Sequence, residues 1–206
     1  MINKPSHKAE RRSVPGIAAR SADDGATTLV GYAAVFGEPA DIAGIFDEII
    51  APGAFTKALT SSDVLAYHSH NSGRVLGRIS SGTLRLAEDE RGLAVEIDLP
   101  DTSDGHDAKI SVARGDIKGM SFGFRVPPGG DKWDFSGSKP VRTIYSVDLE
   151  EVSIVARPAY EGTEVALRSL DEARSVARRQ HNFAAASRRV GMKMTFDLKK
   201  RSKSKA

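Results

Sequence analysis

Short runs of alternating apolar and polar residues fill the chain between residues 28 and 168 and predict a mainly β domain with a few helices, an α+β fold. Strand-like runs lie at 27–37, 42–50, 63–71, 74–79, 82–89 and 91–100. Runs of this length, separated by turn residues, are typical of a sandwich or a barrel. Helices are expected at 51–59 and at 101–115, the second capped by Thr102 or Ser103 and ended by Gly115.

A strand is also predicted in the segment GDIKGMSFGFRV, residues 115–126, and its two faces differ strongly. Met120, Phe122 and Phe124 form an apolar face, and Ser121 lies between two glycines on the other. Glycine weakens a strand and often marks the close approach of another backbone or a ligand. Gly119 and Gly123 could clear space for an extended chain that reaches the Ser121 hydroxyl, or could merely accommodate a neighbouring strand.

The alternation from Val141 to Val155 predicts one long strand, and Glu151 falls in its more apolar row. A carboxylate at such a position is costly unless a partner binds it. The partner could be one of the many arginines. It could also be a histidine that the carboxylate orients, as in a nucleophile–base–orienter set.

The candidate bases are His68 and His70, which lie on the same face of the run at 63–71, and the alternation does not choose between them. The same two histidines could bind a metal, but the chain has no cysteine and few carboxylates nearby, so the ligand set is incomplete and we expect no metal or other cofactor. The sequence around Ser121 also fits Gly-x-Ser-x-Gly. Because the alternation continues past it, Ser121 lies on a strand and not at the sharp turn of an α/β-hydrolase.

Composition adds limits on partners and location. The net charge of +3 arises in the C-terminal segment, where basic residues cluster from Arg174 onward, and the remaining body is acidic. Nucleic acid is therefore an unlikely partner except through non-specific contacts of this tail. No apolar run is long enough to span a bilayer, and the charged start of the chain is not followed by an apolar segment, so we expect no membrane insertion or secretion.

These patterns divide the chain into three parts: a flexible lead-in at 1–27, a domain at 28–170 and a basic, partly helical tail at 171–206. The lead-in is assigned from its polar composition and its prolines and glycines. The tail helix is expected to open at the capping box Ser169-Leu170-Asp171-Glu172 and to run to about Arg189.

The order of several motifs resembles that of the prohead (head maturation) serine proteases of tailed bacteriophages. The resemblance covers about residues 28–170. It rests on GYAAVFG with EIIAPGAF, DVLAYHSHNSGRVLGR, RGLAVEIDLPDT, RGDIKGMSFGFRV and LEEVSIVARPAYEGTEVALRSL. Each motif alone is weakly specific. The resemblance to the family rests on the occurrence of all of them in the same order and at similar spacing.

This resemblance implies a site and a fold. The nucleophile would be Ser121. The base would be His70, because this histidine precedes Leu76-Gly77-Arg78 by the distance usual in the family. The third member would be Glu151, with Glu150 and Asp148 as alternatives. The histidine is followed here by Asn71 where the family commonly has an acid. The fold would be the β-barrel of the herpesvirus maturation proteases.

The resemblance also implies a setting: in the host cytoplasm, inside the assembling procapsid, with capsid subunits, their scaffold or delta segments and the protease itself as substrates, and with possible self-association. The alternative is a catalytically silent scaffold or capsid-binding protein of the same fold.

Overall fold

The computed structural model describes residues 9–21, 26–157, 169–180, 182–183 and 188. The chain divides into a body, residues 1–165, and a C-terminal unit, residues 166–206. The described part of the body is mainly β with two helices, which confirms the expected α+β class. In the C-terminal unit residues 169–180 are helical, and the remainder of the expected tail helix falls mostly outside the described residues.

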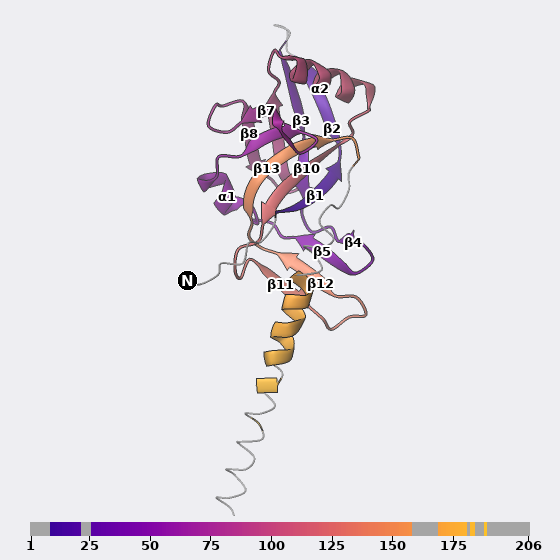
Figure 1. Ribbon diagram of the computed structural model, residues 1–206, viewed down its shortest axis with the longest axis vertical. Helices are drawn as coiled ribbons and strands as arrows, with labels where there is room; N and C mark the ends of the chain where they lie inside the picture. Colours follow the sequence, from indigo (N-terminus) through magenta and orange to yellow (C-terminus); the bar gives the residue numbers. More distant parts are fainter. Residues whose placement is uncertain (1–8, 22–25, 158–168, 181, 184–187, 189–206) are drawn as a thin grey trace, which may run out of the picture. The chain divides into compact units, whose positions relative to one another are not determined.

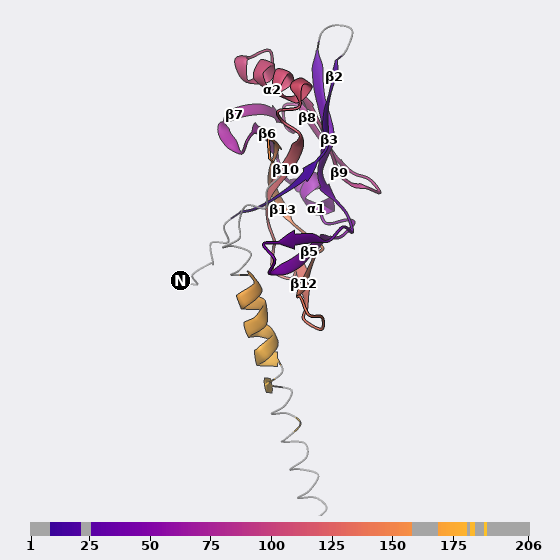
Figure 2. The ribbon, with the colours of Figure 1, turned by 90° about the vertical axis from the view of Figure 1, so that its right-hand side faces the viewer.

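The described residues of the body form three sheets (Figures 1 and 2). The first has the order β1 (Glu10–Pro15), β10 (Gly119–Arg125), β13 (Asp148–Val155), β6 (Leu65–His68) and β7 (Asn71–Arg78). The second has the order β2 (Ile17–Ser21), β3 (Thr27–Val35), β9 (Gly92–Asp98) and β8 (Leu84–Glu88). The third has the order β11 (Asp131–Asp134), β12 (Val141–Ile144), β5 (Phe46–Ile50) and β4 (Ala40–Ile42).

Two helices accompany these sheets, α1 (Thr56–Ser61) and α2 (Ser103–Arg114). The second begins as predicted, because the Thr102 side chain accepts a hydrogen bond from the Gly105 amide, and it ends at Gly115, whose φ of 78° is left-handed. It lies beside β2 and β7 (Figure 2). In the described part of the chain no helix is long and apolar enough to cross a bilayer.

The first sheet positions the residues of interest. Its strand β10 lies between β1 and β13 (Figure 1) and is antiparallel to both, and β13 pairs in parallel with β6. Met120, Phe122 and Phe124 point into the core, as the alternation predicted, and the Phe122 ring packs 4.8 Å from Phe124 and 5.3 Å from Phe55 between centroids. Ser121 therefore faces away from this core cluster.

Several sequence expectations differ from the structure. Residues 10–21 lie within the predicted flexible lead-in but form strands β1 and β2. The run at 42–50 is a hairpin of β4 and β5, and the run at 141–155 is two strands, β12 and β13, in different sheets. Among the described residues the strand pairings leave three open sheets and no closed barrel. The relation to herpesvirus proteases stays a prediction.

Candidate active site

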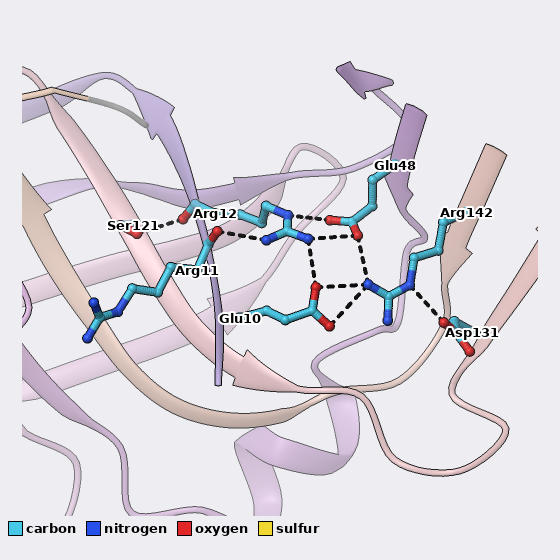
Figure 3. Close-up of polar contacts among 7 residues, drawn as sticks. All are labelled: Glu10, Arg11, Arg12, Glu48, Ser121, Asp131 and Arg142. Carbon is cyan, nitrogen blue, oxygen red and sulfur yellow. Dashed lines mark hydrogen bonds and ion pairs between the residues drawn. The ribbon is translucent and has the colours of Figure 1, made fainter. Parts of the chain in front are cut away.

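Ser121 lies in the middle of β10 and is fully buried. Its register partners are Ser13 on β1 and Ser153 on β13. The Ser121 hydroxyl donates a hydrogen bond of 2.8 Å to the main-chain carbonyl oxygen of Arg12 (Figure 3). The candidate nucleophile is thus tied, in this structure, to the strand that precedes the predicted domain.

A buried ion cluster holds that strand in place (Figure 3). Arg12 on β1 binds Glu48 on β5 with an Nε to Oε1 distance of 2.6 Å and Glu10 with an Nη2 to Oε2 distance of 2.7 Å. Arg142 on β12 contacts the same two glutamates and also Asp131, at 2.7 Å from its Nε atom. Burial alone would lower the pKa of Arg142, but the surrounding carboxylates raise it by more. The net pKa is therefore above its ordinary value, and the guanidinium stays charged. The cluster fixes β1 to the third sheet and so fixes the carbonyl that Ser121 contacts.

Glu151 lies on β13 directly opposite Gly123 of β10. A Cβ atom on Gly123 would lie 2.8 Å from both Cγ and Oε1 of Glu151, closer than real Cβ contacts. Gly123 therefore makes room for the Glu151 side chain of the neighbouring strand, which is the second of the two interpretations of this glycine.

His70 lies at the tip of the β6–β7 hairpin. His68 pairs with Asn71, so Ser69 and His70 are the two loop residues, and their φ angles of 53° and 58° are both left-handed. Positive φ angles at both loop residues define a type I′ turn, whose twist matches that of the two strands it joins. Left-handed residues other than glycine are strained and gather at functional sites. The turn directs the imidazole to β13, where Nδ1 of His70 lies 2.6 Å from Oε1 of Glu151.

Three groups contact the Glu151 carboxylate. His70 and Arg11 share Oε1, with the Arg11 Nε atom 3.5 Å away, and Ser153 donates a hydrogen bond of 2.5 Å to Oε2. Burial alone would raise the pKa of Glu151. The hydrogen bonds from His70 and Ser153 and the charges of His70 and Arg11 lower it by more, so the net pKa lies below its ordinary value. The carboxylate is therefore ionised at neutral pH.

The structure brings His70 and Glu151 together and places Ser121 nearby on the same face of the sheet. Ser121 opposes Ser153, two residues from Glu151, so it is a diagonal neighbour of Glu151. Diagonal neighbours across two strands are separated by about 7–8 Å, within reach of long side chains. With Nδ1 on the carboxylate, Nε2 of His70 is the nitrogen left for a nucleophile. In this structure the Ser121 hydroxyl is bonded to Arg12 instead, and a rotation about its Cα–Cβ bond would have to break that contact.

The other candidates take different roles. Glu150 forms an ion pair with Arg125 at 2.8 Å, and Asp148 is exposed. The His68 Nδ1 atom lies 3.3 Å from an Arg74 nitrogen, and its pKa is lowered by burial and by the Arg74 charge. No cluster of three potential metal ligands occurs within the described ranges.

Sequence reasoning missed Arg11 and Ser153. Arg11 fell in the segment assigned as flexible. Ser153 shares the alternating row of Glu151, two residues on, and this spacing was a usable signal that the two side chains lie on one face.

Comparison with known proteins gives two matches. A sequence profile described as "Caudovirus prohead serine protease" matches residues 16–176. The prohead protease of Enterobacteria phage HK97 is 35% identical over 147 residues, which cover 68% of this chain and 60% of that protein. No solved structure matches significantly. Strand β1 lies before the first residue that the profile matches.

Proposed function

Because this chain belongs to the caudovirus prohead serine protease family, we propose that it is a serine endopeptidase of capsid maturation, acting inside the assembling procapsid. Its substrates would be the scaffold or delta segments of capsid subunits and the chain itself. The fold would be related to that of herpesvirus maturation proteases, and the basic tail at 171–206 would make generic contacts with polyanions.

Three side chains perform the proposed reaction. His70 takes the proton from Ser121 as the hydroxyl attacks the scissile carbonyl, and later gives it to the leaving amine. Glu151 orients the imidazole through Nδ1 and stabilises its protonated form. Before attack the Ser121 hydroxyl leaves the Arg12 carbonyl and turns to Nε2 of His70.

The observation that carries this proposal is the hydrogen bond of 2.6 Å between His70 and Glu151. The two residues come from motifs 81 positions apart, and the contact depends on a strained turn. A carboxylate bonded to Nδ1, which leaves Nε2 for a serine hydroxyl, is the arrangement that serine proteases use.

A fluorophosphonate probe, which reacts with activated serines, tests the proposal on the full chain. We expect the wild type to be labelled and mass mapping to locate the adduct on Ser121. Ser121→Ala should abolish labelling with the fold retained, while Ser81→Ala, at an exposed turn serine, should be labelled like the wild type. Labelling of Ser121→Ala at the wild-type rate would contradict the nucleophile assignment.

One observation favours a second candidate, the catalytically silent scaffold or capsid-binding protein. Ser121 is fully buried and its hydroxyl is engaged by Arg12, so the resting site is closed. Absence of labelling in the wild type, together with an intact capsid protein after co-expression, would support this silent function. Cleavage of the capsid protein by the wild type and not by Ser121→Ala would exclude it.

A further inference from the structure

Ser153 is a fully buried residue of β13 that the reaction described above does not use. Its hydroxyl donates a hydrogen bond of 2.5 Å to Oε2 of Glu151, while Oε1 faces His70. The two oxygens of the carboxylate thus have separate, fixed partners. Ser153 also lies directly opposite Ser121, so it stands between the strand of the nucleophile and the strand of the base.

The Glu151 carboxylate needs such a second contact to be held in one orientation. Its terminal torsion is broad and roughly two-fold, so one hydrogen bond from His70 leaves the carboxylate free to swing. Arg11 does not fix the torsion, because it approaches Oε1, the oxygen that His70 already uses, and its side chain is 39% exposed. Ser153 is the residue whose contact defines the plane of the carboxylate.

We propose that Ser153 is a positioning residue, which holds the Glu151 carboxylate in the rotamer that presents Oε1 to Nδ1 of His70. This inference rests on the proposed function, since it assigns Ser153 a part in the same reaction. Ser153 does not touch the substrate. Its hydroxyl acts only through Glu151, so removing the hydroxyl should affect turnover and leave probe binding unchanged.

Saturation kinetics of fluorophosphonate labelling on the full chain separate these effects into kinact and KI. We expect Ser153→Ala to lower kinact about 10- to 100-fold, as small displacements of catalytic groups do, with KI within about 2-fold of wild type. Ser153→Thr keeps the hydroxyl and should restore kinact to within about 3-fold of wild type. Thr27→Val is the matched control, because it removes a buried strand hydroxyl with no hydrogen-bond partner among the described residues, and it should leave kinact unchanged.

A double-mutant cycle tests whether Ser153 acts through Glu151. In the Glu151→Gln background, Ser153→Ala should change kinact by less than about 2-fold, because the group it positions is gone. Circular dichroism and urea unfolding show under which conditions every variant is folded, and kinact is compared under those conditions. A role in stability alone would move the unfolding midpoint and leave kinact of the folded Ser153→Ala protein at the wild-type value, which would overturn the inference.

Two other results have separate meanings. A wild type labelled on Ser121, with Ser153→Ala labelled equally fast, overturns the role of Ser153 and leaves the proposed function intact. An adduct that maps to Ser153 overturns both the positioning role and the choice of Ser121 as nucleophile.

Discussion

Gly123 and Glu151 face each other across β10 and β13 so closely that a single methyl group on Gly123 would meet the Cγ and Oε1 atoms of Glu151 at 2.8 Å. Gly123→Ala should therefore push the carboxylate away from His70. We expect proteolytic turnover to fall about 10- to 100-fold, because small misplacements of catalytic groups have effects of this size. Cleavage of a co-expressed capsid protein, followed on gels over time, measures the change.

Gly137→Ala is the matched control for that variant. A Cβ atom at Gly137 would make only an ordinary contact of 3.5 Å with the Lys139 carbonyl oxygen. It should leave cleavage unchanged. Equal activity of Gly123→Ala and Gly137→Ala would show that Glu151 tolerates displacement and has no orienting role.

Phe122 holds the apolar side of the strand that carries Ser121. Its side chain is 1% exposed and its ring contacts those of Phe55 and Phe124. Phe122→Ala should lower the free energy of unfolding by about 3–5 kcal/mol, since it removes a buried ring and leaves a cavity. Urea denaturation measures this loss. A loss below about 1 kcal/mol would mean that the surrounding core collapses into the space.

The ion cluster predicts a strong contrast between buried and exposed arginines. Arg12→Met leaves the Glu48 carboxylate, which is 2% exposed, without its shortest ion pair, and should cost about 3–5 kcal/mol of unfolding free energy. Arg85→Met removes exposed pairs with Glu96 and Asp98, and should cost less than about 1 kcal/mol. Similar losses in the two variants, measured by urea denaturation, would refute the structural importance of the cluster.

Glu10 gives the cluster a pH dependence. Burial alone would raise the pKa of Glu10. The charges of Arg142 and Arg12 and their hydrogen bonds lower it by more, so the pKa in the folded chain lies below the ordinary 4.5. The stabilisation by Glu10 is therefore complete above about pH 4.5 and is lost as the pH falls through the folded pKa.

Glu10→Gln should accordingly be less stable than the wild type at neutral pH and should lose less stability between about pH 5 and about pH 3. Urea unfolding midpoints across this range provide the measurement. A pH dependence identical to that of the wild type would show that Glu10 titrates alike in the folded and unfolded chains.

Much of the body could be predicted from local pattern. Met120, Phe122 and Phe124 alternate with small residues. An alternation of this kind that continues for several residues indicates a β-strand. The helix at 103–114 carries its own start and stop signals in Thr102 and Gly115. The pairing of Glu151 with a histidine was one of two options, because the cost of a lone buried carboxylate demands some cation and does not specify which. The structure shows both: His70 and Arg11.

The misses have physical causes. Strand β1 has the sequence ERRSVP, and its burial depends on Glu48 and Arg142, which are distant in sequence, so its polar composition looked like that of a flexible segment. The turn at Ser69 and His70 contains no glycine, which hid the left-handed angles. The break between β12 and β13 has no proline or glycine. There the amides of Tyr145 and Ser146 bond to the Gly130 carbonyl, and the chain leaves one sheet for another.

The order of strands in the first sheet also limits when the site can exist during synthesis. β10 is enclosed by β1, from the beginning of the chain, and by β13, which ends at Val155. In a growing polypeptide the hairpin residues around His70 are made first, and the acidic partner, Glu151, is added 81 residues later. The first strand must wait over a still longer stretch for its neighbour, and such non-local pairing is slow. Until synthesis has passed Val155, a nascent chain therefore holds only an unfinished site.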